Sequence, residues 1–188
     1  MSSWPAQLNI AHISQRTHTL GPGERAVLWV KGCPQQCPSC IAPEWQSFAR
    51  DQVLSIDDAL DKLLEFPDIT GLTFSGGEPF AQASALAELA RKARERRELN
   101  IICFTGYSHE KLGRSPKDSG AARLLKQIDV LIDGIYIHEL NDGIGLRGSN
   151  NQRIIHLTSR LKHQQLEHFP RKITIDLSRR KLLVTGIP

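Results

Sequence analysis

The sequence predicts an α/β fold in which helices cover a parallel sheet. One observation is a set of short strand patterns that are apolar on both faces, as strands inside a parallel sheet are. These patterns are residues 26–30 (AVLWV), 100–107 (NIICFTGY) and 129–133 (DVLID). The other observation is that amphipathic helix patterns alternate with these strands, which indicates strand–helix–strand units with right-handed crossovers. At 188 residues the chain is long enough for one domain with its own hydrophobic core.

The predicted helices and the strand between them have recognisable boundaries. Residues 55–66 repeat apolar side chains at helical spacing, with Ser55 as the N-cap and Pro67 after the last turn. A strand over 71–79 (GLTFSGGEP) then runs into a glycine turn, and a second amphipathic helix begins at Ser84. A further helix, SGAARLLKQI, precedes the last of the apolar strands.

Polar motifs follow the predicted strands. GCPQQC, SGGEP, TGY and DG each come just after a strand pattern. The carboxyl ends of parallel strands meet at one edge of a sheet, and ligands bind at that edge. The sequence therefore predicts one ligand site to which all four motifs contribute.

The composition is that of a globular protein. The chain is 40% apolar and 23% charged, and its 24 basic and 20 acidic residues give a formal net charge of +4. The densest basic run, 91–98, is interrupted by glutamates and is interpreted as a solvated helix face. No apolar run reaches 18 residues, and no signal-peptide pattern opens the sequence. We therefore expect a cytoplasmic protein with no nucleic-acid or membrane partner.

Three of the four cysteines are concentrated in one loop. Cys33, Cys37 and Cys40 lie within eight residues, whereas Cys103 lies in an apolar strand pattern and is expected to be a small buried hydrophobe. Structural zinc fits poorly because no second CxxC and no suitably spaced histidine pair is present. A [4Fe–4S] cluster fits better, since three thiolates leave one iron open to an exogenous ligand.

The cysteine loop and the segments that accompany it resemble a known family. The spacing Cys33-x3-Cys37-x2-Cys40 is that of radical S-adenosylmethionine (SAM) enzymes. The accompanying segments, in order, are GPGER, FSGGEPFAQ, FTGY, DVLIDG and LRGSNNQRI. Together, over roughly residues 20 to 160, the chain resembles the anaerobic (class III) ribonucleotide reductase activating enzyme and related activases of glycyl-radical enzymes. The resemblance implies a partial (β/α) barrel-like parallel sheet of radical SAM type.

The resemblance also implies a set of cofactors and site residues. Cys33, Cys37 and Cys40 would bind one [4Fe–4S] cluster, and SAM would chelate the remaining iron. The residues implied to contact SAM are Ser39, Cys40, Ile41, Gly76, Gly77 and Glu78. Glycines let a backbone approach a ligand closely, and the glutamate supplies negative charge for the methionyl ammonium group. Ser39 stands where many of these enzymes have an aromatic residue, so the adenine contact is left unassigned.

Further candidates come from the polar ends of the later segments. Asp133 ends a buried strand, where a carboxylate needs a partner, so it either caps a neighbouring backbone or faces the ligand edge. Arg147 and Asn151 are candidates for the SAM or partner side by resemblance. The GPGER segment, 21–25, is interpreted equally well as a turn or as part of the site.

The function implied is reductive cleavage of SAM to methionine and a 5′-deoxyadenosyl radical that abstracts hydrogen, so no catalytic general base is expected. The expected partners are a glycyl-radical enzyme as protein substrate and an electron donor such as flavodoxin or ferredoxin. Two alternatives stay open: a stand-alone radical SAM enzyme that modifies a peptide or small molecule, and a non-catalytic iron–sulfur binding module. A shared fold does not decide among them.

The C-terminal part of the chain departs from the family pattern. We expect a radical SAM core over 1–160 and an extension over 161–188 in the same globular unit. Alternating residues over 172–185 predict a β-hairpin, and a two-stranded hairpin needs something to pack on. The expected arrangement has Ile173, Ile175 and Leu177 facing the domain. The basic residues Arg179, Arg180 and Lys181 are then exposed at the turn as partner contacts.

Overall fold

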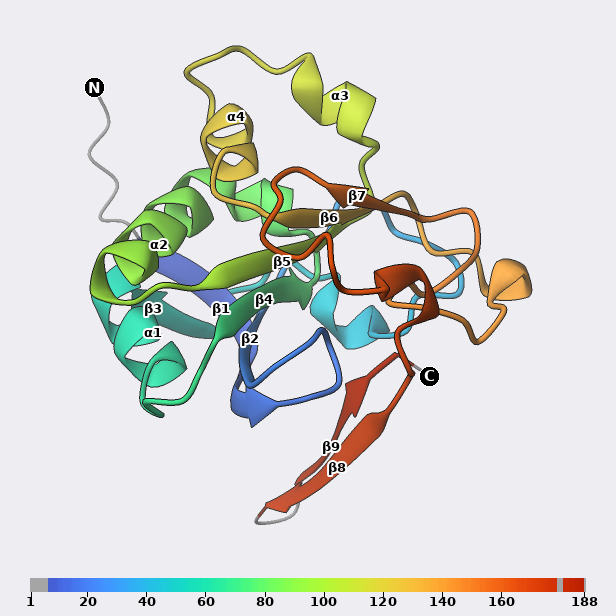
Figure 1. Ribbon diagram of the computed structural model, residues 1–188, viewed down its shortest axis with the longest axis horizontal. Helices are drawn as coiled ribbons and strands as arrows, with labels where there is room; N and C mark the ends of the chain where they lie inside the picture. The colour runs from blue at the N-terminus through green and yellow to red at the C-terminus, as the bar shows by residue number, and fades with distance from the viewer. Residues whose placement is uncertain (1–6, 179–180, 188) are drawn as a thin grey trace.

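The computed structural model describes residues 7–178 and 181–187, and this part of the chain forms a seven-stranded sheet and a separate two-stranded hairpin (Figure 1). The strands of the large sheet are β1 (Gln7–Thr17), β2 (Arg25–Val30), β3 (Gln52–Ser55), β4 (Gly71–Gly76), β5 (Asn100–Thr105), β6 (Val130–Asp133) and β7 (Arg153–His156). Their order is β3-β1-β2-β4-β5-β6-β7. Strands β2, β4, β5 and β6 run parallel, whereas β1 and β7 flank them antiparallel.

The prediction of a mostly parallel α/β sheet is confirmed. The sheet ends in β3 at one edge and β7 at the other, so the described strands form an open sheet and not a closed barrel. The sequence patterns identified the four parallel strands, but β1, β3 and β7 were not predicted. These three strands are short or amphipathic and only partly buried, so they lack the continuous apolar run that marks β2.

Helices cover one face of the sheet. The helices are α1 (Ile56–Leu63), α2 (Ala83–Arg96), α3 (His109–Gly113) and α4 (Gly120–Leu125). Figure 1 shows α1, α2 and α4 together on this face. Helix α2 buries Leu86, Leu89, Ala90 and Ala93, which lie on one side at helical spacing. The predicted N-cap of α1 is confirmed, since the Ser55 hydroxyl accepts a hydrogen bond from Asp58 N at 3.1 Å.

The other face of the sheet is covered by irregular chain, which differs from the expected helical cover. Its core contains Trp29, Ile102 and Ile132 from the sheet, and Leu146 and Leu166 from the connections after β6 and β7. Short 3₁₀ turns lie between the larger elements: η1 (Pro43–Trp45) after the cysteines, η2 (Pro79–Gln82) after β4, η3 (His138–Leu140) after β6 and η4 (Leu166–His168) after β7. Loops on this face leave room for a cavity beside the carboxyl ends of the strands.

Arg25, the last residue of GPGER, is the first residue of β2 and lies at the opposite end of the strands from those carboxyl ends. Its side chain is fully buried. The guanidinium donates from Nε to Thr73 Oγ1 at 2.7 Å and also donates to the Leu72 carbonyl and to Asn100 Oδ1. Arg25 thus ties together the amino ends of β2, β4 and β5, which gives this segment a structural role.

The predicted C-terminal hairpin is present, but its expected packing is wrong. Strands β8 (Ile173–Ser178) and β9 (Lys181–Gly186) form a two-stranded sheet of their own, and this hairpin projects from the body (Figure 1). Ile173, Ile175 and Leu177 do not face the domain; they are 53%, 57% and 80% exposed. The expected positions of Arg179, Arg180 and the Lys181 side chain lie outside the described residues.

Candidate functional site

A cavity of about 410 Å³ lies at the carboxyl ends of the parallel strands. The sequence-predicted residues that line it are Cys33, Cys37, Cys40, Ile41, Gly76, Gly77 and Glu78. Residues at the ends of β5 and β6, Thr105, Gly106 and Gly134, complete that side. The strand-end motifs therefore meet at one cavity, as the sheet topology predicts.

The cysteine loop is held against the sheet by its own backbone. Gly32 N donates to the Trp45 carbonyl at 2.8 Å, and Cys33 N donates to the Gln46 carbonyl at 2.9 Å. Gly32 has a φ of +98°, and a Cβ at this position would lie 2.5 Å from the Phe48 ring. A glycine is therefore needed where the loop leaves β2. These contacts fix both ends of the segment that carries the three thiols.

All three loop cysteines are free and partly buried, whereas Cys103 is free and fully buried in β5. Burial raises the pKa of the Cys33 and Cys37 thiols. Within the described residues, no three His, Cys, Asp or Glu side chains are arranged to hold a single metal ion. Three thiols that line one cavity without converging on one point suit a cluster that takes one thiolate at each of three irons.

The glycines of SGGEP are required by the protein's own backbone. A Cβ on Gly76, whose φ is +103°, would lie 2.6 Å from both the nitrogen and the carbonyl oxygen of Val30. A Cβ on Gly77 would lie 2.4 Å from the Gly32 carbonyl oxygen. In addition, Gly77 N donates to the Val30 carbonyl at 2.7 Å. These glycines thus allow the end of β4 to pack closely against β2 and the start of the cysteine loop.

Glu78 is a buried carboxylate at the cavity, only 1% exposed. Its Oε1 accepts hydrogen bonds from Thr105 Oγ1 and Phe80 N, both at 2.9 Å, and its Oε2 accepts one from Gly106 N at 2.8 Å. Burial raises the pKa of this carboxyl, and the two backbone N–H donors and the Thr105 hydroxyl oppose the shift. A carboxylate has about four acceptor positions, so three bonds leave one for a donor in the cavity.

The cavity has an aromatic wall that sequence reasoning missed. Trp29 and Trp45 both line it, and their ring centroids are 5.9 Å apart. His12 extends the contact from β1, with its ring 5.6 Å from that of Trp29. Trp45 lies five residues after Cys40, and this closeness in sequence to the cysteine loop could have identified it as a site residue.

Four of the predicted site residues do not line the cavity: Ser39, Asp133, Arg147 and Asn151. Ser39 is exposed. Asp133 is 1% exposed and takes the first of its two expected roles: Oδ2 accepts from His109 N at 2.6 Å and Oδ1 accepts from Arg153 Nε at 2.9 Å. Arg147 Nη2 pairs with Asp142 at 2.8 Å.

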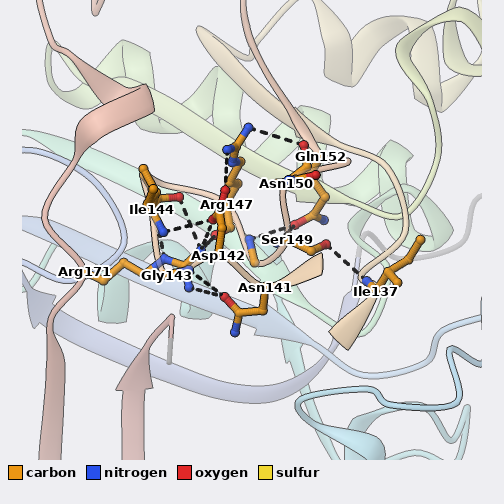
Figure 2. A network of polar contacts seen from close by, with 12 residues as sticks. Ile137, Asn141, Asp142, Gly143, Ile144, Arg147, Ser149, Asn150, Gln152 and Arg171 are labelled. Carbon is orange, nitrogen blue, oxygen red and sulfur yellow. Dashed lines mark hydrogen bonds and ion pairs between the residues drawn. The ribbon is translucent and has the colours of Figure 1, made fainter. Parts of the chain in front are cut away.

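The LRGSNNQ segment instead contributes through a polar network, shown in Figure 2. Gln152 Oε1 accepts from Gly148 N at 2.8 Å, while its Nε2 donates to the Gly134 carbonyl at 2.7 Å. Gly148, Gln152 and Gly134 all line the cavity. Asn151 Nδ2 donates to the Ile135 carbonyl at 2.9 Å, which fixes the same turn. The segment therefore shapes the cavity with backbone and amide groups.

Arg171 anchors this network to the start of the hairpin. Its side chain is 9% exposed and donates to Asn141 Oδ1 and to the Arg147 carbonyl, both at 2.6 Å (Figure 2). It also lies 3.6 Å from the Asp142 carboxylate. The base of the hairpin is thereby attached to the loop that shapes the cavity.

Comparisons with known proteins agree with this geometry. A family model described as a 4Fe-4S single cluster domain matches residues 19–155. The anaerobic ribonucleoside-triphosphate reductase-activating protein of Vibrio cholerae is 35% identical over 144 residues, which are 72% of this chain and 89% of that protein. The protein of the same name from Enterobacteria phage T4 is 34% identical over 143 residues, 71% of this chain and 85% of that protein. The chain belongs to the glycyl-radical-enzyme activases.

This activase also resembles the pyruvate formate-lyase-activating enzyme of Clostridium pasteurianum, with 32% identity over 94 residues, 47% of this chain and 40% of that enzyme. The activase is thus an enzyme with a 4Fe-4S domain. The family match ends within β7, so the hairpin lies outside it. No helix in the described ranges is long and apolar enough to cross a bilayer.

Proposed function

We propose that this activase binds one [4Fe–4S] cluster through Cys33, Cys37 and Cys40, binds SAM in the adjoining cavity, and abstracts a hydrogen atom from a glycine of an anaerobic ribonucleoside-triphosphate reductase. The observation that carries the proposal is that the three thiols share one cavity with Gly77 and Glu78. The cluster that Cys33, Cys37 and Cys40 would hold would supply one electron for the cleavage of SAM to methionine and a 5′-deoxyadenosyl radical, the species that would take the hydrogen atom.

The donor set suits this cofactor pair. Three cysteines leave one iron of a [4Fe–4S] cluster without a protein ligand, and that iron can take the amino and carboxylate groups of SAM. Cys103 is fully buried in β5 and is not among the residues that line the cavity. Burial raises the pKa of its thiol well above the ordinary value, which disfavours the thiolate that a metal requires.

The chain's own residues would bind SAM and keep water away. Glu78 has an acceptor position left for an N–H of the SAM amino group, and its three internal hydrogen bonds hold the carboxylate in place. The apolar surfaces of Ile41, Trp29 and Trp45 line the cavity and favour a flat heterocycle over bulk water. A one-electron donor such as flavodoxin or ferredoxin would reduce the cluster.

The choice of partner rests on similarity. The relatives from Vibrio cholerae and phage T4, which match most of this chain, are reductase-activating proteins by name. The two other candidates, a stand-alone enzyme for a peptide or small molecule and a non-catalytic iron–sulfur module, have no such support.

The test combines two electron paramagnetic resonance (EPR) measurements under anaerobic conditions. The reduced holoprotein should show the signal of a [4Fe–4S]⁺ cluster that changes when SAM is added. After incubation with SAM and the reductase of the same organism, the mixture should show a glycyl radical. A cluster signal that SAM does not alter would favour the binding module. SAM cleavage without a glycyl radical would favour the stand-alone enzyme.

A further inference from the structure

The C-terminal hairpin exposes apolar side chains on one of its faces. Ile173, Ile175, Leu177 and Val184, here called the hairpin face, are 53%, 57%, 80% and 51% exposed. The first three alternate along β8, and Ile175 is paired directly with Val184 of β9, so all four share a side of the two-stranded sheet. Such a face is costly to leave in water, and in the described structure no part of the domain covers it.

The hairpin face runs to the mouth of the cavity that holds the cysteines. Val184 belongs both to this face and to the lining of the cavity, and the neighbouring Gly186 and Ile187 line the cavity as well. Ile187 is 7% exposed and joins the core that contains Trp29 and Leu166. The hairpin is therefore anchored at its base while its apolar face extends outward from the proposed site of chemistry.

The C-terminal segment that contains the hairpin accounts for the net charge of the protein. Residues 171–188 include five of the 24 Lys and Arg residues and one of the 20 Asp and Glu residues, so they hold the entire formal net charge of +4 and the rest of the chain is neutral. Arg171 is held in the network at the base, so in sequence the exposed apolar residues are accompanied by Lys172, Arg179, Arg180 and Lys181. A segment of this composition is complementary to an apolar segment bordered by acidic residues.

We propose that the hairpin face is a docking surface for the glycine-bearing protein, and that it holds an apolar, acid-flanked segment of that protein so that the glycine reaches the cavity. This rests on the proposed function and names how its protein substrate is bound. A small-molecule substrate would need no apolar surface beyond the cavity. The hairpin also lies outside the shared family domain, as expected of an element that fits one particular partner.

The experiment uses the holoprotein and the anaerobic ribonucleoside-triphosphate reductase of the same organism. The double variant Ile175→Thr, Leu177→Thr removes apolar surface but keeps strand-forming residues. The matched control is Thr174→Ser, an exposed change on the opposite side of the same strand. Binding of the reductase is measured in the presence of SAM at low and high salt, beside SAM cleavage without reductase and glycyl-radical yield with it.

The double variant should bind the reductase at least about tenfold more weakly and should give less glycyl radical at limiting concentration, while SAM cleavage without reductase is unchanged. Binding by the parent protein should weaken as salt rises. The control should match the parent protein in each measurement.

Three results would overturn the proposal. In one, the parent protein activates the reductase and the double variant binds and activates it equally well, which refutes the docking surface alone. In another, the parent protein neither binds nor activates the reductase, which refutes the proposed function and the docking surface together. In the last, the double variant turns a dimer of this chain into a monomer with no change in reductase affinity, which assigns the face to self-association.

Discussion

The Glu78 carboxylate accepts a hydrogen bond from the Thr105 hydroxyl at 2.9 Å, and this contact joins the carboxyl end of β5 to the turn after β4. The same carboxylate accepts from Gly106 N, and Glu78 N donates to the Gly32 carbonyl beside the cysteine loop at 2.9 Å. One residue thus connects two strand ends and the loop that carries the thiols, so changes at Glu78 affect both the cavity and its cofactors.

Glu78→Gln should weaken SAM binding by about tenfold or more, because the hydrogen bond from the SAM amino group to a charged carboxylate is lost. The amide nitrogen would also face a backbone N–H donor at Gly106 or Phe80, which should lower the free energy of unfolding by about 1–3 kcal/mol. The control is Glu98→Gln, which removes the same charge from a side chain that is 86% exposed. Equilibrium dialysis with labelled SAM measures the first effect. Equal affinity in the two variants would exclude Glu78 from the SAM site.

The stability of the protein should depend on pH through Glu78. Burial raises the pKa of this carboxyl above its ordinary value of 4.5, so the folded state binds the proton more tightly than the unfolded state. The contribution of Glu78 to stability is therefore greatest below pH 4.5 and falls as the pH rises through the folded pKa. Urea unfolding should show the parent protein losing stability relative to Glu78→Gln over this range. A relative gain with rising pH would contradict the assignment.

Gly77→Ala should disrupt the site, because the added Cβ would lie 2.4 Å from the Gly32 carbonyl oxygen. Moving the two segments apart would break the backbone hydrogen bonds from Gly77 N to Val30 and from Glu78 N to Gly32. We expect a loss of at least about 2 kcal/mol of unfolding free energy. Gly113→Ala is the matched control, since a Cβ there meets no atom within 4 Å and the position lies in α3. The control should be neutral or stabilising by about 0.5–1 kcal/mol in thermal unfolding. Similar melting temperatures for the two variants would refute the close approach.

Single changes of Cys33, Cys37 or Cys40 to Ala should abolish the [4Fe–4S] cluster, whereas Cys103→Ala should keep it. Cys103 is fully buried, so its replacement should cost only about 1 kcal/mol of packing. Iron and sulfide content after anaerobic reconstitution measures the difference. Loss of the cluster in Cys103→Ala, or about eight irons per chain in the parent protein, would contradict a single site on the loop.

The parallel strands and their strand-end motifs were predictable because they carry strong local signals. Buried parallel strands are continuously apolar, as in β2, and glycine turns such as SGGEP mark where they end. Ligands bind at the carboxyl ends of parallel strands, so Cys33 and Glu78, which follow two such strands, were expected at one site, and both line the cavity.

What could not be predicted depends on contacts between distant segments. Trp29 and Trp45 form the aromatic wall only after the cysteine loop folds back on β2. Asp133 was a site candidate because a buried carboxylate needs a partner, and sequence alone does not reveal that Arg153 supplies one. The hairpin was predicted from the alternation of apolar and polar residues. This pattern indicates that one face of the hairpin is apolar, but it does not indicate whether the domain covers that face. Hence Ile175 and Leu177 were expected inside and are exposed.

The most direct test of hydrogen abstraction by this activase is isotope transfer from the partner's glycine. The reductase is prepared with α-deuterated glycine and incubated anaerobically with reduced holoprotein and SAM, and the 5′-deoxyadenosine formed is examined by mass spectrometry. We expect one deuterium in 5′-deoxyadenosine and a matching amount of glycyl radical in the reductase. Unlabelled 5′-deoxyadenosine, with no radical in the reductase, would contradict this expectation.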